Sequence, residues 1–374
     1  MSEIRMVDLV GQYQDIKEEL RIAFDSILEN ASFINGSEVR DFAKEFEEYL
    51  DVKHVIPCAN GTDALQIALM ALNLPAGSEV ICPSFTFVAT AEVISLLGLK
   101  PVFVDVDPET FNLNLASVEA SISHNTKVII PVHLFGLPVD MQPLLDLAKE
   151  KGLKIVEDTA QGIGADIVLN GEHKKVGTIG DIGCTSFFPS KNLGAYGDGG
   201  AIMTNDDLLA DKMRKIVNHG MEKRYYHELV GVNSRLDTLQ AAVLRIKLRK
   251  LNTYNSNRNS AAQYYNEAFA SVEDLICPSI PEDRTHVFHQ YTLRVQNGKR
   301  DALKQHMDDL GIPAMIYYPV PLHEQKPYRR ERISPHGLPV TRMLKEEVIS
   351  LPMHTELTGV QLKEITDAVV SFFS

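Results

Sequence analysis

The chain has 374 residues, of which 44% are hydrophobic and 23% are charged, and its formal net charge is −13. These values are typical of a globular protein large enough for more than one core, and they argue against a nucleic-acid partner, which would need a basic face. An anionic small molecule is not excluded, because a local pocket can be positive on an acidic protein.

Cysteine usage and hydropathy argue against two further classes, metal-binding proteins and secreted or membrane proteins. The four cysteines form no Cys-x-x-Cys pair and have no metal-ligand spacing, so we expect small buried thiols and no metal. The N-terminus carries acids where a secretory signal has an apolar core. The longest apolar stretch, residues 85–104, is broken by Glu92, Lys100 and Pro101. We therefore expect a cytoplasmic protein without a membrane partner.

Between residues 50 and 220, strand-like and helix-like segments alternate along the chain. Strands are predicted at 54–58, 79–82, 101–106, 127–132 and 154–158, with two more that end near 188 and 204. Helices are predicted at 62–72, 86–97 and 141–151. Apolar strands without polar alternation are typical of strands covered on both faces. The pattern predicts an α/β fold whose mostly parallel sheet has helices on both faces.

The remainder of the chain has a different character. The first fifty residues are mostly helical and are expected to pack on the outside or against a partner. Residues 236–270 give one long helical pattern that suits a connector. Strands at 287–295 and 314–318 and helices at 300–310 and from 360 then predict a smaller C-terminal α+β domain. We place the large domain at 1–250 and the small one at 251–374. The Arg- and Pro-rich stretch 326–339 is predicted to be a surface loop.

Asn60-Gly61-Thr62-Asp63 lies between a predicted strand and the helix that follows. Free N–H groups at a helix start bind anions, and Gly61 would allow a phosphate to come close. The same four residues are equally good turn and N-cap chemistry.

Asp158 ends a strand, at the edge where open α/β sheets bind ligands. Its carboxylate could keep a pyridine nitrogen protonated, and Gln161 could reach a ring hydroxyl. A helix-capping role for Asp158 is the alternative.

Lys191 follows two aromatic residues, stands five residues after Ser186 and precedes a glycine-rich turn. A desolvated lysine amine can form a Schiff base, and Ser186 could bind a phosphate together with Thr62. Phe85 or Phe87 could stack on a flat ring, although either could equally be core. Lysine, strand-end acid and nearby hydroxyl are together what pyridoxal phosphate (PLP) requires.

The motifs of other enzyme classes are missing from the sequence. It contains no Gly-x-Gly-x-x-Gly after a strand, no phosphate-binding Gly-x-x-x-x-Gly-Lys-Ser/Thr, no Gly-x-Ser-x-Gly and no His-Glu-x-x-His.

With these motifs located, the chain resembles the DegT/DnrJ/EryC1/StrS family of PLP-dependent sugar aminotransferases. The resemblance rests on residues 58–65, 156–161, 185–191 and 231–237, and extends from Met6 to His354. It implies the aspartate-aminotransferase (type I) fold and a homodimer with shared active sites.

The resemblance also implies a role for individual residues. Lys191 would hold PLP as a Schiff base and move the proton, while Asp158 pairs the ring nitrogen and Gln161 meets the ring oxygen. The resemblance assigns the other positions to the phosphate (Gly61, Thr62, Ser186 and, from the neighbouring subunit, Asn233), to ring stacking (Phe87) and to the nucleotide-sugar (His219, Arg235, Tyr317, Tyr318).

One branch of the family has histidine at the lysine position and dehydrates sugars, so Lys191 favours transamination. Residues 184–191, 233–240 and 318–322 most resemble the enzymes that aminate C3 of a UDP-linked 2-acetamido-3-keto-glucuronic acid, with L-glutamate as the usual donor. Three alternatives stay open: a dTDP-linked 3-keto- or 4-keto-6-deoxy sugar as substrate, a PLP lyase or dehydratase, and a non-catalytic binding or regulatory protein.

Overall fold

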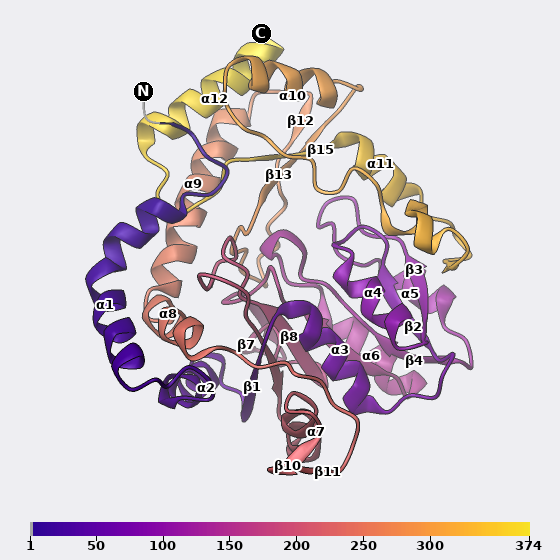
Figure 1. The fold of residues 1–374 in the computed structure, drawn as a ribbon. Coiled ribbons are helices and arrows are strands. Elements are labelled where there is room, and N and C mark those ends of the chain that lie inside the picture. The colour runs from indigo at the N-terminus through magenta and orange to yellow at the C-terminus, as the bar shows by residue number, and fades with distance from the viewer. Residues whose placement is uncertain (1–2) are drawn as a thin grey trace.

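An eight-stranded sheet forms the centre of the larger part of the molecule in the computed structural model, which describes residues 3–374 (Figure 1). Its strand order is β1-β9-β8-β5-β4-β2-β3-β14. Only β9 runs antiparallel to its neighbours. The strands are β1 (His54–Cys58), β2 (Glu79–Pro83), β3 (Lys100–Val104), β4 (Thr126–Ile129), β5 (Lys154–Asp158), β8 (Ile182–Ser186), β9 (Gly200–Thr204) and β14 (Arg332–Ile333). The mostly parallel sheet predicted from the sequence is confirmed.

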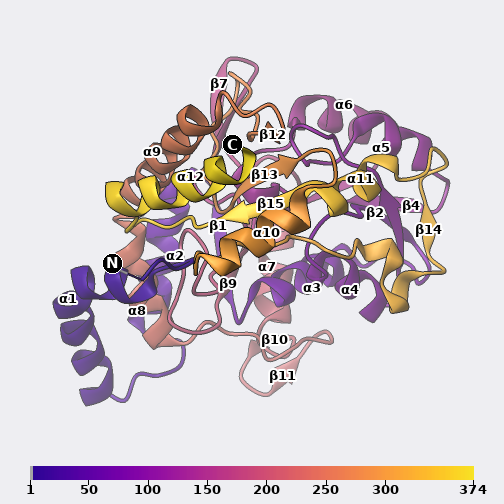
Figure 2. The ribbon, with the colours of Figure 1, turned by 90° about the horizontal axis from the view of Figure 1, so that it is seen from above.

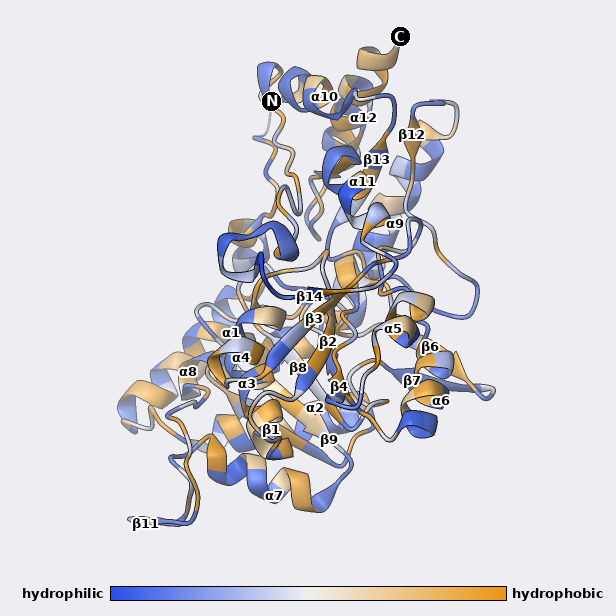
Figure 3. Ribbon diagram, turned by 90° about the vertical axis from the view of Figure 1, so that its right-hand side faces the viewer, coloured by the Kyte–Doolittle hydropathy of each residue, from blue (hydrophilic) through white to orange (hydrophobic). Residues whose placement is uncertain are grey.

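Helices cover both faces of this sheet because alternate strand residues point to opposite sides and are apolar on both. On one face Val80, Cys82 and Cys184 pack against α3 (Gly61–Leu72), α4 (Ala89–Leu96) and α7 (Asp207–Ile216). On the other, Ile81 and Ile155 pack against α6 (Met141–Lys151), with α5 (Leu115–Ser121) beside it. As the hydropathy colours of Figure 3 show, the sheet is the apolar centre of this part.

The N-terminal helices lie at the β1 end of the sheet. Helix α2 (Ser37–Leu50) contacts β1 and α8 (Thr238–Leu248), and α1 (Leu9–Glu29) contacts α8. Beyond α7, the hairpin of β10 (Met221–Lys223) and β11 (Tyr226–His227) projects from the body (Figures 1 and 3).

The smaller part contains a three-stranded antiparallel sheet of order β12-β13-β15, seen from above in Figure 2. Its elements are β12 (Leu275–Ile276), β13 (Tyr291–Val295), β15 (Val348–Leu351), α10 (Arg300–Asp309) and α12 (Gly359–Phe373). Helix α9 (Leu251–Phe269) contacts α12 and links the two parts (Figure 1). Within residues 3–374, no helix combines the length and hydrophobicity needed to cross a bilayer.

The prediction of a surface loop at 326–339 is only partly right, because the segment is partly exposed but also anchored to the large sheet. Tyr328 and Leu338 are buried, and β14 adds a parallel strand to the edge of the large sheet beside β3. The segment is tied down by Asp105, whose carboxylate accepts hydrogen bonds from Val340 N (2.9 Å), Thr341 N (2.8 Å) and Thr341 Oγ1 (2.7 Å) at the start of α11 (Pro339–Glu347). The Arg- and Pro-rich segment therefore leads the chain back to the edge of the large sheet and packs against it.

Three element predictions also differ from the structure. The helical pattern at 236–270 is two helices that meet at Arg249–Lys250. The strand predicted at 314–318 is reduced to a single bridge between Met315 and Ser350, since the flanking Pro313 and Pro319 lack the N–H that a ladder needs. The strand predicted from 287 begins at Tyr291, because the backbone carbonyls of residues 286–289 accept hydrogen bonds from side chains and not from a neighbouring strand. The domain boundary at 250/251 stays a prediction, and the C-terminal return segment also pairs with the large sheet through β14.

We predict that Asp105→Ala lowers the free energy of unfolding by about 3 kcal/mol, because three donors lose their acceptor in a buried setting. Urea denaturation measures the change. The control is Asp309→Ala, which removes an exposed carboxylate bonded only to Gln305 and should change stability by about 0.5 kcal/mol or less. Equal effects of the two substitutions would contradict the proposed tie.

Candidate active site

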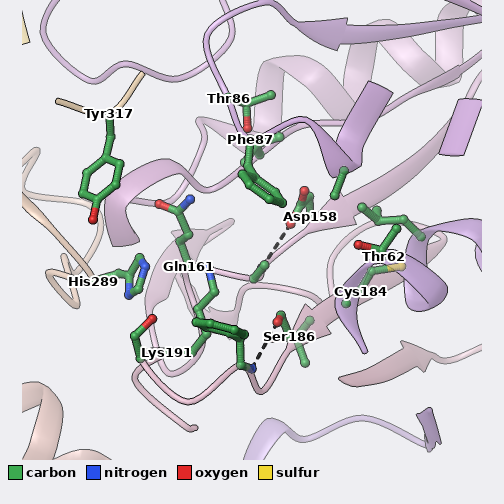
Figure 4. A pocket seen from close by; sticks show the side chains of 18 of the residues that line it. Thr62, Thr86, Phe87, Asp158, Gln161, Cys184, Ser186, Lys191, His289 and Tyr317 are labelled. Carbon is green, nitrogen blue, oxygen red and sulfur yellow. Dashed lines mark hydrogen bonds between the residues drawn. The ribbon is translucent and has the colours of Figure 1, made fainter. Parts of the chain in front are cut away.

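A cavity of about 820 Å³ lies where the carboxyl ends of β5 and β8 and the start of α3 meet two segments of the C-terminal part. Those segments are residues 289–290 and 316–319. Figure 4 shows Phe87, Asp158, Gln161 and Lys191 directed toward one shared space. This is the strand-end position at which open α/β sheets bind ligands.

Lys191 reaches this cavity from the loop that follows β8. Its backbone N–H donates to Phe188 O (2.8 Å), and the loop returns at Gly194, where a Cβ would lie 2.3 Å from Pro189 O. The glycine is therefore required for the turn that presents the lysine. Burial lowers the pKa of the Lys191 amine to about 8, although the charge of Asp158 opposes this. Such an amine is partly neutral near physiological pH and can act as a nucleophile or base.

Asp158 lies at the last position of β5, opposite Lys191. Its Oδ2 accepts from Thr90 Oγ1 (2.9 Å) and its Oδ1 accepts from Ala160 N (3.1 Å). Burial raises the pKa of this carboxyl, while the two hydrogen bonds and the Lys191 charge act the other way. A cationic ligand group beside the carboxylate would offset its desolvation. The helix-capping alternative is not supported, since no helix begins at Asp158 in the described chain.

The predicted phosphate-binding residues lie together at the start of α3. The N-cap prediction is confirmed, because Asn60 Oδ1 accepts from Asp63 N (2.8 Å). Phosphate binding stays a prediction, and the helix start does face the cavity. A Cβ on Gly61 would lie 2.6 Å from the Cβ of Ser186, so glycine lets α3 and β8 approach. The hydroxyls of Thr62 and Ser186 line the same corner. The dipole of α3 and its first N–H groups favour an anion here.

Aromatic and amide side chains form the walls. Phe87 is 53% exposed over the cavity while Phe85 is fully buried, so Phe87 is the residue available for ring stacking. Gln161 Oε1 accepts from Phe135 N (2.8 Å), and its Nε2 donates to the Tyr318 hydroxyl (3.2 Å). Its amide thus links the large sheet to the segment that carries Tyr317 and Tyr318.

Three predicted residues lie outside this cavity. His219, Asn233 and Arg235 belong to the segment between α7 and α8, where Asn218 pairs with Asn233 in a β-bridge. His219 and Asn233 are exposed. Within one chain the structure therefore does not bring these three residues to Lys191.

Two residues that the sequence analysis did not single out also line the cavity. Thr86 Oγ1 and His289 Nδ1 are buried and have no hydrogen-bond partner among residues 3–374. Thr86 is adjacent to Phe87 and could have been found with it. The sequence gives little indication of a functional role for His289, because it shows only a His-Gln pair inside a predicted strand.

The residues present fit PLP. A phosphate matches the start of α3, a flat ring matches the exposed face of Phe87, and a protonated ring nitrogen matches the buried Asp158 carboxylate. Lys191 supplies a partly neutral amine in the same cavity. No group of three or more His, Cys, Asp or Glu residues suited to a metal ion occurs in the part of the chain that the structure describes.

Fold and site together define a type I PLP-dependent enzyme. Residues 14–370 match the model of the DegT/DnrJ/EryC1/StrS aminotransferase family, and the chain belongs to this family. The resemblance predicted from the sequence motifs is confirmed.

The chain is similar to known proteins over nearly its whole length. A UDP-N-acetyl-3-dehydro-alpha-D-glucosamine 3-aminotransferase of Acidithiobacillus ferrooxidans is 45% identical, covering 98% of this chain and 97% of the relative. A UDP-2-acetamido-2-deoxy-3-oxo-D-glucuronate aminotransferase of Pseudomonas aeruginosa is 41% identical over 98% of this chain and 100% of its own. The crystal structure of S. venezuelae DesV in complex with a ketimine intermediate superimposes with a TM-score of 0.95 at 36% identity, covering 100% and 99% of the two chains.

We predict that the reactivity of Lys191 rises at unusually low pH in the cofactor-free protein. Below its pKa the amine is protonated and unreactive, so acylation should increase as the pH rises through about 8, well below the ordinary lysine value of 10.5. Because the Asp158 charge raises this pKa, Asp158→Asn should move the midpoint lower still. Mass spectrometry of the Lys191 peptide after brief acylation at a series of pH values measures both. Lys363, exposed and paired with Asp367, is the control and should react only at higher pH.

Proposed function

We propose that this chain is a cytoplasmic aminotransferase that moves an amino group from L-glutamate to the C3 keto group of a UDP-linked 2-acetamido-2-deoxy-3-oxo sugar, of the glucuronic acid type, for cell-surface polysaccharide. The observation that carries the proposal is that Lys191 and Asp158 face one cavity with the start of α3. The names of the two UDP-sugar relatives support the choice of substrate class.

We assign the cofactor contacts by position in the cavity. Gly61, Thr62 and Ser186 hold the phosphate, and Phe87 covers the ring. Asp158 would pair with the ring nitrogen, because its carboxylate is buried, hydrogen-bonded and in no salt bridge among residues 3–374. Gln161 meets the ring oxygen through the remaining N–H of its amide. Tyr317 and Tyr318 border the sugar end.

When bound, PLP supplies an aldehyde carbon that takes up the amine and a ring that accepts electrons. Lys191 then serves as the base. Its nitrogen lone pair would take the proton from the substrate carbon, while the electron pair of the broken C–H bond would be accepted by the ring. Lys191 would later return the proton to the carbon on the other side of the transferred nitrogen. Asp158 would stabilise the positive ring nitrogen, which favours the build-up of negative charge on the substrate carbon.

The chemistry of the ligands points to a second subunit. A cofactor phosphate, a nucleotide diphosphate and two glutamate carboxylates are all anionic, yet among the described residues that line the cavity Lys191 is the only lysine or arginine. The hairpin of β10 and β11 exposes Arg224 stacked on Tyr225 and Lys223 stacked on Tyr226. We propose a C2 homodimer in which this region of each subunit, with His219, Asn233 and Arg235, completes the site of the partner.

We predict that the protein converts L-glutamate to 2-oxoglutarate in step with amination of a UDP-linked 3-keto sugar, and that Lys191→Ala loses at least about a thousandfold in kcat, since base and covalent attachment are lost together. A panel of UDP- and dTDP-linked 3-keto and 4-keto sugars, read by mass spectrometry of the product and by release of 2-oxoglutarate, tests the donor and the substrate.

The matched control is Lys247→Met. Lys247 is also a buried lysine whose pKa burial lowers, to about 7, but it lies outside the cavity. Borohydride reduction should attach the cofactor to the Lys191 peptide in the wild type and in Lys247→Met. Attachment at Lys247, or normal turnover by Lys191→Ala, would refute the assignment.

A shared site makes a separate prediction. Lys191→Ala and Asn233→Ala homodimers should each be impaired, whereas co-expression of the two variants should restore about a quarter of the wild-type activity, because half of the dimers are mixed and each has one intact site. Two affinity tags isolate the mixed dimers. If Asn233 acted within its own chain, mixing would restore nothing.

A further inference from the structure

His289 lies on the cavity wall but has no role in the chemistry described so far. Its ring is buried, neither ring nitrogen makes a hydrogen bond among residues 3–374, and Nδ1 is enclosed without a partner. Figure 4 shows the ring directed into the space that Lys191 enters. Lys191 is also near enough that its charge lowers the pKa of His289, after burial, the larger cause. An enclosed polar atom without a partner is costly, so it calls for an explanation.

A neighbouring histidine shows what a structural histidine looks like here. His286 is buried too, but its Nδ1 accepts from Phe288 N (3.0 Å) and its ring stacks on Phe288 with centroids 3.8 Å apart. His286 does not line the cavity. Since the two histidines share one segment and only His289 is unpaired, packing alone does not explain His289.

The backbone that carries His289 is held unusually firmly. Each of the four consecutive carbonyls from 286 to 289 accepts a hydrogen bond from a side chain. The donors are Asn259 to His286 O (2.9 Å), Asn192 to Val287 O (2.8 Å), and Arg258 to Phe288 O (3.0 Å) and His289 O (3.3 Å). A rigid frame around an unpaired side chain is typical of a functional position.

The same frame holds Lys191. Asn192, the next residue, donates both to Val287 O and to Asn255 Oδ1 (2.8 Å) of α9. Lys191 and His289 are thus fixed to each other through one hydrogen-bonded unit, with α9 as its base.

In the proposed function, the protonated amine of Lys191 requires a hydrogen-bond acceptor, and His289 has one available. When Lys191 has taken a proton from the substrate carbon, it is an ammonium with three N–H groups in a cavity whose burial disfavours that charge. The nearby Gln161 Oε1 is engaged with Phe135 N, and both Asp158 oxygens already accept hydrogen bonds. Arg258, the other charged group near His289, is bound to backbone carbonyls and offers no acceptor. A neutral imidazole nitrogen is a free acceptor.

We propose that His289 is the hydrogen-bond acceptor that stabilises the protonated ε-amine of Lys191 while the amine carries the proton between the two carbon atoms. The proton stays on the Lys191 nitrogen, and the imidazole donates only its lone pair to the N–H···N contact. The inference rests on the proposed function, but the hydrogen bond that it assigns needs no substrate to form.

The first test uses the cofactor-free protein, with acylation of the Lys191 peptide as the readout. Loss of an acceptor destabilises the ammonium, so His289→Leu should lower the pKa of Lys191 by about 0.5–1. A change of this size corresponds to the net free energy of one hydrogen bond. His289→Gln keeps an acceptor and should retain most of the wild-type value. His286→Gln is the matched control and should leave the Lys191 titration unchanged.

The second test follows the glutamate half-reaction of the loaded enzyme. His289→Leu should slow removal of the glutamate α-proton about tenfold to a hundredfold at unchanged cofactor content, with partial rescue in His289→Gln. An unchanged Lys191 titration together with a rate within about twofold of the wild type in His289→Leu would overturn the proposal. Neither result depends on which sugar is the substrate, and loss of cofactor attachment at Lys191 would instead refute the proposed function.

A third measurement avoids substitution of His289. Deuterium exchange at the imidazole C2–H, read by mass spectrometry, reports on the ring's surroundings. Replacing the partner in Lys191→Met should change the exchange rate of His289 at least about twofold and leave that of His286 unchanged. Equal rates for His289 in the two proteins would count against the contact even if His289→Leu failed to fold.

Discussion

The structure depends on holding one positive and one negative group, Lys191 and Asp158, away from water in the same cavity. Burial alone makes both ions unfavourable, and it shifts their pKa values in opposite directions, down for the amine and up for the carboxyl. Each charge partly offsets the cost of the other. The remaining cost is met by fixed dipoles, since Thr90 and Ala160 donate to Asp158 and the start of α3 faces the anion corner. The arrangement therefore favours a ligand that brings a cationic ring nitrogen and a phosphate together.

Enclosure of these charges needs the C-terminal part as well as the sheet. The chain leaves the large sheet through α9, supplies residues 289–290 and 316–319 to the cavity wall, and then returns to pair β14 with β3. Two buried ties secure this return, Asp105 at the start of α11 and Ser84 Oγ to His323 Nδ1 at 2.7 Å. Since Ser84 lies three residues before Phe87, its hydrogen bond to His323 joins the cavity wall that carries Phe87 to the C-terminal return segment.

The sequence was most informative where local pattern and chemistry coincide. Apolar strands such as β2 and β5 carry their burial in their own residues, and Asp158 and Lys191 are placed by the ends of strands. What could not be predicted depends on partners distant along the chain. Tyr328 and Leu338 are buried by a return across the sheet edge, and Arg258 holds a segment thirty residues away. His289 looks like a strand residue until its neighbours' carbonyls are seen to be engaged by side chains.

A lowered lysine pKa does not by itself identify an active site, as Lys247 demonstrates. Its amine is buried over the ring of Tyr196 (4.2 Å to the centroid), has no hydrogen-bond partner among the described residues, and has its pKa lowered even further than Lys191, to about 7. Yet Lys247 does not line the cavity that Asp158 and the start of α3 share with Lys191. Desolvation makes an amine reactive, but only the sheet edge supplies a place for a substrate. The meeting of Lys191 with Asp158 and α3, more than the basicity of either lysine, is what makes one of them a candidate for catalysis.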